Sequence, residues 1–111
     1  MEVMKEQHGM VTVLALRGAL NNDSVEALLG EISACKAAGS LRIVLEMREV
    51  PLIDSTGLES IQSILVDLGR RGGDMCLAGV NKVCRDIFIA TRMESLARIY
   101  DDVPDAVRSF T

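Results

Sequence analysis

The sequence contains no tryptophan, one tyrosine and two phenylalanines among its 111 residues, so its hydrophobic core has to be aliphatic. It also lacks any apolar run that approaches the ~20 residues needed to cross a membrane. Its first six residues, Met1 to Glu6, are charged and lack the apolar centre of a secretory signal. We therefore expect a cytoplasmic protein with no membrane insertion.

Basic residues are too few to make a nucleic-acid-binding face. The chain has 12 lysines and arginines against 16 aspartates and glutamates, a formal net charge of −4. Proteins that bind nucleic acids need a basic surface, and those that bind single strands also need aromatic side chains on which bases stack. We therefore expect no direct nucleic-acid partner.

Metal-binding and disulfide patterns are also missing. Cys35, Cys76 and Cys84 are odd in number and fall within apolar patterns, which predicts reduced, buried thiols. A zinc site needs closely spaced pairs of cysteine or histidine, and the only histidine, His8, falls in a predicted turn. The sequence therefore predicts neither a metal site nor a cofactor.

The sequence does contain a regular alternation of strand-like and helix-like segments. Apolar residues make up 49% of the chain, which is enough for one domain spanning residues 1–111. The order β-β-α-β-α-β-α-β-α predicts an α/β fold with a mixed, mostly parallel sheet of four to five strands and about four helices. We expect strands at 2–7, 10–17, 41–47, 75–78 and 96–100, and helices that begin at Asn22 or Asp23, at Ser55, after Asn81, and after Asp101 or Asp102.

Several helix boundaries carry specific signals. Asp23 and Glu26, three residues apart, have the form of a capping box. Gly39 is a natural stop for the first helix, and Gly72-Gly73 ends the second. We expect the third helix to pack through Val83, Cys84, Ile87, Phe88 and Thr91. We expect the last helix to dock on the sheet through its apolar residues, Val103, Ala106, Val107 and Phe110.

The chain changes from strand to helix within residues 50–58, Val-Pro-Leu-Ile-Asp-Ser-Thr-Gly-Leu. Asp54 and Ser55 are both preferred N-cap residues, because their side-chain oxygens accept hydrogen bonds from the free N–H groups of a first helical turn. In the simplest interpretation Ser55 is a plain cap with Asp54 as its alternative. Thr56 would then be an exposed first-turn residue, and Gly57 would let the first turn lie close to a neighbouring loop.

Familiar enzyme motifs are not found. No G-x-S-x-G elbow surrounds Ser55, and His8 is the only histidine that could act as its base. The chain has neither a G-x-x-x-x-G-K-[ST] loop nor a G-x-G-x-x-G turn for a nucleotide. The stretch Asp-Ser-Thr-Gly at 54–57 differs by one intervening residue from an aspartic-protease motif, which also requires two carboxylates sharing a proton. We therefore predict that the protein is not an enzyme.

The stretches 43–45 and 52–58 together resemble the signature of the anti-sigma factor antagonists, which belong to the STAS domain family (sulphate transporter and anti-sigma factor antagonist). Residues 18–21, Gly-Ala-Leu-Asn, lie where the family usually has Gly-Glu-Leu-Asp, in a loop expected near Ser55. Residues 72–75 and 99–107 resemble the family's later strand and closing helix. Asn21 replaces the usual Asp, Ala19 the usual acidic or polar residue, and Arg92 a common Gly.

This resemblance implies a STAS-like fold and a bacterial partner-switching regulator. The unphosphorylated protein would bind an anti-sigma factor, itself a serine kinase with a histidine-kinase-like ATP fold, and so release a sigma factor. The kinase would phosphorylate Ser55, and a metal-dependent serine phosphatase would restore it. The resemblance places partner binding at Asn21, Asp54, Ser55, Thr56, Gly57 and Leu58.

Other roles of STAS domains stay open at this point. The same fold serves in stressosome-like assemblies and as a small subunit of ABC lipid-transport complexes, where the surface around Ser55 would be a constitutive contact. Weak nucleotide binding is a further alternative, although the chain has no glycine-rich loop to hold phosphates.

Overall fold

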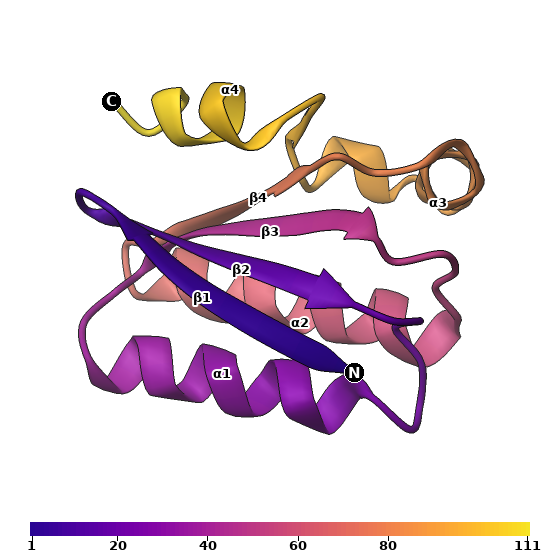
Figure 1. The fold of residues 1–111 in the computed structure, drawn as a ribbon, viewed down its shortest axis with the longest axis horizontal. Helices are drawn as coiled ribbons and strands as arrows, with labels where there is room; N and C mark the ends of the chain where they lie inside the picture. The colour runs from indigo at the N-terminus through magenta and orange to yellow at the C-terminus, as the bar shows by residue number, and fades with distance from the viewer.

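The computed structural model describes residues 1–111, and the predicted order of strands and helices is confirmed (Figure 1). The elements are β1 (Glu2–His8), β2 (Val11–Arg17), α1 (Val25–Ala37), β3 (Arg42–Glu49), α2 (Ser55–Arg70), β4 (Asp74–Ala78), α3 (Lys82–Ala90), the 3₁₀ turn η1 (Met93–Ser95), β5 (Ile99–Tyr100) and α4 (Val103–Arg108).

The five strands form one mixed sheet in the order β1-β2-β3-β4-β5. β1 and β2 are antiparallel, whereas β2 to β5 are parallel to their neighbours. Helices α1 and α2 cover one face of the sheet, and α4 lies on the opposite face (Figure 1). The α/β class, with a mostly parallel sheet, therefore agrees with the prediction.

The two faces of the sheet bury cores of very different size. The face covered by α1 and α2 contributes to a cluster of 21 buried residues, which also includes Cys84 and Phe88 of α3. The other face has a cluster of only six buried residues, against which apolar residues of α4, together with Tyr100 and Phe110, pack. The predicted docking residues of the last helix are confirmed, because Ala106 belongs to this smaller cluster and Val103, Val107 and Phe110 pack against it.

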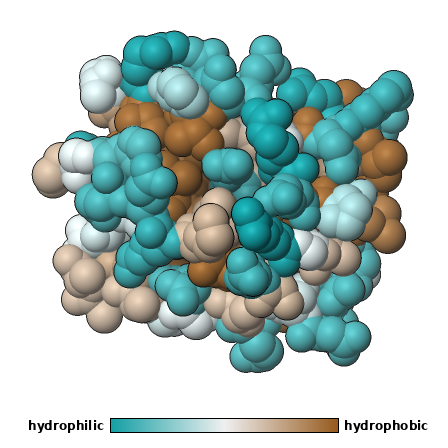
Figure 2. All heavy atoms as spheres, in the orientation of Figure 1, coloured by the Kyte–Doolittle hydropathy of each residue, from teal (hydrophilic) through white to brown (hydrophobic).

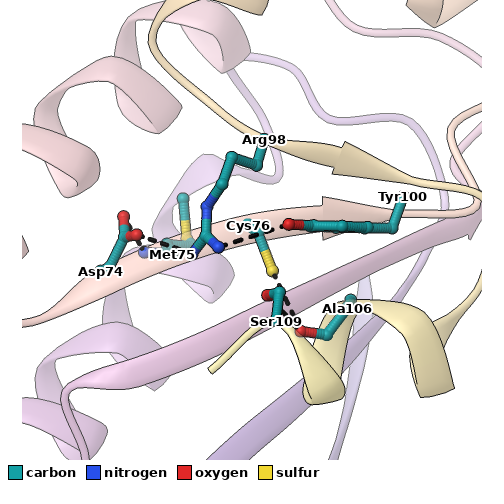
Figure 3. A network of polar contacts seen from close by, with 7 residues as sticks. All are labelled: Asp74, Met75, Cys76, Arg98, Tyr100, Ala106 and Ser109. Atoms are coloured by element: carbon teal, nitrogen blue, oxygen red, sulfur yellow. Dashed lines mark hydrogen bonds and ion pairs between the residues drawn. The ribbon is translucent and has the colours of Figure 1, made fainter. Parts of the chain in front are cut away.

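Arg98, which directly precedes β5, bonds to Asp74 at the start of β4 and to Tyr100 in β5 (Figure 3). Its Nη2 donates to Asp74 Oδ2 at 2.8 Å, and its guanidinium carbon lies 5.2 Å from the centre of the Phe110 ring. Beside this network, Cys76 Sγ lies 3.9 Å from the Ala106 carbonyl oxygen, to which it donates. These contacts add to the apolar packing that holds α4 against β4.

The start of α1 differs from the sequence prediction. The helix begins at Val25, and its N-cap residue, Ser24, makes no capping hydrogen bond with its side chain. Instead Asn21 Oδ1 accepts hydrogen bonds from the N–H groups of Asp23 and Ser24, at 2.9 and 3.2 Å. Because this Asx turn satisfies the donors before the helix begins, the predicted capping box is not formed.

Two further details refine the sequence prediction. Within the predicted segment 96–100, the strand is limited to Ile99–Tyr100, and η1 at Met93–Ser95 comes before that segment. All three cysteines are free and buried, as predicted, and burial raises the pKa of each thiol, which keeps it protonated and unreactive. No helix combines the length and the apolar character required to cross a membrane.

Candidate functional site

Ser55 is the first residue of α2 and is exposed to solvent. The cap is Asp54, whose backbone is extended and whose Oδ1 accepts a hydrogen bond from the N–H of Gly57 at 2.9 Å. The structure thus decides between the two caps that the sequence allowed. Because Asp54 caps the helix, the Ser55 hydroxyl is left free at its positive end.

Gly57 is buried at a point where α2 nearly touches the loop after β2. A Cβ atom at this position would lie 2.6 Å from the Leu20 carbonyl oxygen and 2.8 Å from Ile53 Cγ1. Both distances are too short for a methyl group, so the position requires glycine. The close approach to a neighbouring loop that the sequence suggested is therefore present.

The loop that contains Asn21 lies beside the start of α2, as expected. Leu20 forms a short parallel bridge with Ile53: its N–H donates to the Leu52 carbonyl at 3.0 Å, and its own carbonyl accepts from the Asp54 N–H at 3.1 Å. Two residues further on, the Asn22 N–H donates to Asp54 Oδ2 at 3.3 Å. Segments 18–22 and 52–57 therefore form one continuous surface.

The start of α3 adjoins the same surface from the other side. Asn81 caps α3, as predicted, with Oδ1 accepting from the Cys84 N–H at 2.8 Å. Its Nδ2 donates to the Val50 carbonyl at 3.0 Å. The loop between β3 and α2 is thus held on one flank by the Asn21 loop and on the other by the first turn of α3.

Two exposed apolar residues belong to this region and were given no functional role from the sequence. Leu52 in the loop and Val83 in α3 each have 53% of their surface exposed. The predicted packing of Val83 with the apolar face of its helix is therefore wrong. Figure 2 shows hydrophobic atoms reaching the surface over α3, where Ile89 is also about half exposed. In the sequence, the one indication that Leu52 is exposed is its position in a predicted loop, directly after Pro51.

The six predicted partner-binding residues lie together but are not equally accessible. Ser55 is exposed, Asn21, Asp54, Thr56 and Leu58 are intermediate, and Gly57 is buried. Thr56 is therefore less exposed than expected, and Leu58 packs partly against the main core. Ser55 is the member of the set best placed to receive a modification.

The charged and metal-ligating groups nearest to Ser55 in sequence and structure are few. The first turn of α2 contains no acidic residue, and the carboxylate of the cap, Asp54, directly precedes Ser55 in sequence. His8 lies at the end of β1, where it pairs with Val11 at the start of β2, and its Nε2 is 2.8 Å from Glu6 Oε1. It therefore lies at the opposite end of β2 from the loop that follows this strand. The structure contains no group of three or more acidic, histidine or cysteine side chains that could hold a metal.

Comparison with known proteins identifies a family and several similar structures. The model of the STAS domain family matches residues 2–106. A candidate anti-sigma factor antagonist from Thermotoga maritima is 22% identical, with a TM-score of 0.90 over 96% of this chain and 92% of that chain. An anti-sigma factor antagonist from Mycobacterium paratuberculosis is 20% identical, with a TM-score of 0.87 over 97% of this chain and 92% of that chain.

A third structure is the Bacillus cell fate determinant SpoIIAA in its phosphorylated form. It is 18% identical, with a TM-score of 0.76 over 99% of this chain and 100% of that chain. Comparison with curated protein sequences finds no significant match. At these identities the three structures establish the shared fold.

Proposed function

Because this chain belongs to the STAS domain family, we propose that it is an anti-sigma factor antagonist switched off by phosphorylation of Ser55. The observation that carries this proposal is the exposed Ser55 hydroxyl, left free at the start of a 16-residue helix that Asp54 caps. The similarity to anti-sigma factor antagonists, including SpoIIAA in a phosphorylated form, supports the same role.

A phosphate at Ser55 is compatible with the fold. It adds about −1.5 to −2 charges near neutral pH. The positive end of a helix stabilises such a charge by about 0.3–1 kcal/mol, and Ser55 is exposed, so no packing has to change. The phosphorylated protein therefore keeps its structure, and only its surface changes.

At a docked interface the same phosphate becomes unfavourable. The surface around Ser55 combines the Asp54 carboxylate with the exposed apolar side chain of Leu52. A dianion buried there loses its hydration and is repelled by Asp54, which costs several kcal/mol. Since about 1.4 kcal/mol corresponds to a tenfold change in affinity, docking falls by orders of magnitude without any refolding.

The partners follow from this role. The unphosphorylated protein, acting as a single domain in the cytoplasm, binds an anti-sigma factor that is itself a serine kinase, and a sigma factor is released. The kinase transfers phosphate to Ser55, and a metal-dependent phosphatase removes it. The protein acts as a substrate and binding module in this cycle and supplies no catalytic group.

Phosphosite mapping tests the proposal. The protein is incubated with ATP and an extract of the cells that produce it, and phosphopeptides are identified by mass spectrometry. We expect phosphate on Ser55 that is lost in Ser55→Ala and retained in Thr56→Ala. Ser63→Ala is the matched control, because Ser63 is exposed further along the same helix.

Two results would contradict the proposal. Phosphate on Thr56 in place of Ser55 would reject the assigned acceptor. Recovery of an ABC ATPase on the immobilised protein, with Ser55 unmodified, would favour a constitutive subunit of a transport complex.

A further inference from the structure

Asp54 makes two hydrogen bonds with two different parts of the chain. Its Oδ1 accepts from the Gly57 N–H within α2, at 2.9 Å, and its Oδ2 accepts from the Asn22 N–H in the loop after β2, at 3.3 Å. Capping alone requires only the first of these bonds. The second connects the helix that carries Ser55 to a separate loop.

The bond between Asn22 and Asp54 lies beyond the last backbone hydrogen bond that joins the loop to the start of α2. The backbone hydrogen bonds between the two segments involve Leu20 on the loop side and end there. Beyond Leu20, the Asn22–Asp54 contact is the next attachment to the start of α2. The position of residues 21 and 22 relative to Ser55 therefore depends on the Asp54 side chain.

The loop also contains several hydrogen bonds of its own. Ser24 Oγ accepts from the Asn21 N–H at 2.9 Å and donates to the Ala19 carbonyl at 2.7 Å. Asn21 Oδ1 in turn accepts from the Asp23 and Ser24 N–H groups. Because Leu20 and Ser24 on either side are buried, loss of the attachment at Asn22 would displace only the residues between them, 21–23.

The residue type at position 54 agrees with this double role. Both groups that face Asp54 are N–H donors, so both of its side-chain atoms have to be acceptors, which a carboxylate provides. Asn81 performs the corresponding double role at the start of α3, but its second neighbour is the Val50 carbonyl. There one side-chain atom has to donate, and the residue is an amide.

We propose that Asp54 is a positioning residue, which holds residues 21–23 of the loop beside Ser55 so that both dock on the partner as one surface. This inference rests on the proposed function, since it assumes that the kinase recognises the surface around Ser55. In this proposal Asp54 acts through the position of the loop that its Oδ2 holds.

Asp54→Ser separates the two roles of the residue. Serine can still cap α2 by accepting from the Gly57 N–H, but it has no second oxygen for Asn22. The matched control is Asp102→Ser, because Asp102 caps α4 through Oδ1 and the Asp105 N–H at 2.9 Å and makes no second side-chain hydrogen bond. Asp54→Asn is a second test variant, which keeps a capping oxygen and places an NH₂ group near Asn22.

Two quantities are measured on the full chain. The first is the hydrogen-exchange rate of the Asn22 amide by NMR, which we expect to rise about tenfold in both Asp54 variants and to stay unchanged in the control. The second is phosphorylation of Ser55 by extract and ATP at increasing protein concentration. We expect the half-saturating concentration to rise about tenfold with the maximal rate nearly constant, because docking is weakened and the acceptor hydroxyl is unchanged.

Each outcome decides the proposal. Faster exchange at Asn22 together with a higher half-saturating concentration supports it. Unchanged exchange rejects the attachment, and faster exchange with unchanged phosphorylation kinetics rejects its role in docking, while the proposed function survives both results. Absence of phosphate on Ser55 in the wild-type protein rejects the proposed function and the docking role with it.

Discussion

Helices α2 and α3 begin in the same way but present different surfaces. Each follows a strand of the parallel sheet, and each is capped by a side chain, Asp54 or Asn81, that also bonds to a neighbouring loop. In α3 the first residue is Lys82, whose Nζ is 2.8 Å from Asp86 Oδ2 in the next turn. In α2 the first residue is Ser55, which has no such partner.

The third residue after each cap differs as well. In α3 this residue is Cys84, which fills the space beneath the helix with a fully buried side chain. In α2 it is Gly57, and the space is taken by the Leu20 carbonyl of the neighbouring loop. The two helices therefore share one capping arrangement with different surroundings. In α3 the third residue packs as a side chain, whereas in α2 it lets the Leu20 loop approach the helix beside the free Ser55 hydroxyl.

The largest expected effect comes from a negative charge at the first residue of α2. Ser55→Asp should reduce capture of the kinase by at least about 100-fold, because a charge is placed in the docked surface beside Asp54. Binding to the kinase identified by phosphosite mapping is measured by calorimetry, and the circular dichroism spectrum should not change. Ser63→Asp, which adds the same charge further along the helix, is the control. Equal binding by Ser55→Asp and wild type would contradict the switch.

The second prediction tests the close approach at Gly57. Gly57→Ala should lower the free energy of unfolding by about 1–3 kcal/mol, because its methyl group would overlap the Leu20 carbonyl. Gly69→Ala on the same helix is the control: no atom lies within 4 Å of its added Cβ, so this change should stabilise the protein by about 0.5–1 kcal/mol. Urea unfolding measures both, and similar effects of the two substitutions would show that the contact with Leu20 is not rigid.

The third prediction exchanges the chemistry of the α3 cap. Asn81→Asp keeps the oxygen that caps α3 but replaces the donor to the Val50 carbonyl with a second acceptor. The free energy of unfolding should fall by about 1–2 kcal/mol. The introduced carboxylate and the Val50 carbonyl would repel each other only while the carboxylate is ionised, so the loss should diminish at a pH below the carboxylate's pKa. A loss that does not depend on pH would argue against this explanation.

The smallest expected effect concerns the ends of the two helices. Helix α2 is followed by Gly72 in the left-handed region, at φ 79°, whereas α3 is followed by Arg92 at φ 61°. A side chain in this region costs about 1–2 kcal/mol, part of which is offset by the greater chain entropy of glycine. Arg92→Gly should therefore raise the free energy of unfolding by about 0.5 kcal/mol in urea titrations. A destabilised variant would indicate that Arg92 makes a compensating contact.

Much of the fold followed from local patterns, because apolar periodicity and cap residues act over a few positions of sequence. The cap Asn81 and the docking face of α4 were predicted for this reason, and the cap of α4 was narrowed to Asp101 or Asp102, of which the structure has Asp102. The predicted start of α1 was wrong because Asn21 Oδ1 accepts from the Asp23 N–H, which in a capping box would donate to the Glu26 side chain.

The candidate site was predictable only in part. The sequence placed Ser55 at a helix start and its neighbour loop nearby, but it left the choice of cap open. The structure answers it through a long-range contact: Asp54 has extended backbone and donates its N–H to the Leu20 carbonyl, and the helix begins after it. The exposure of Leu52 and Val83 likewise depends on how three segments meet, and no local pattern contains that information.

The contact between Gly57 and the Leu20 carbonyl has a consequence for how this protein can evolve. Any larger residue at position 57 becomes tolerable only after the loop around Leu20 has moved away, and that loop gains nothing by moving while glycine remains. Residue 57 and the loop around Leu20 are therefore expected to change together or not at all. Lineages that have lost the glycine should also carry an altered length or sequence between residues 18 and 22.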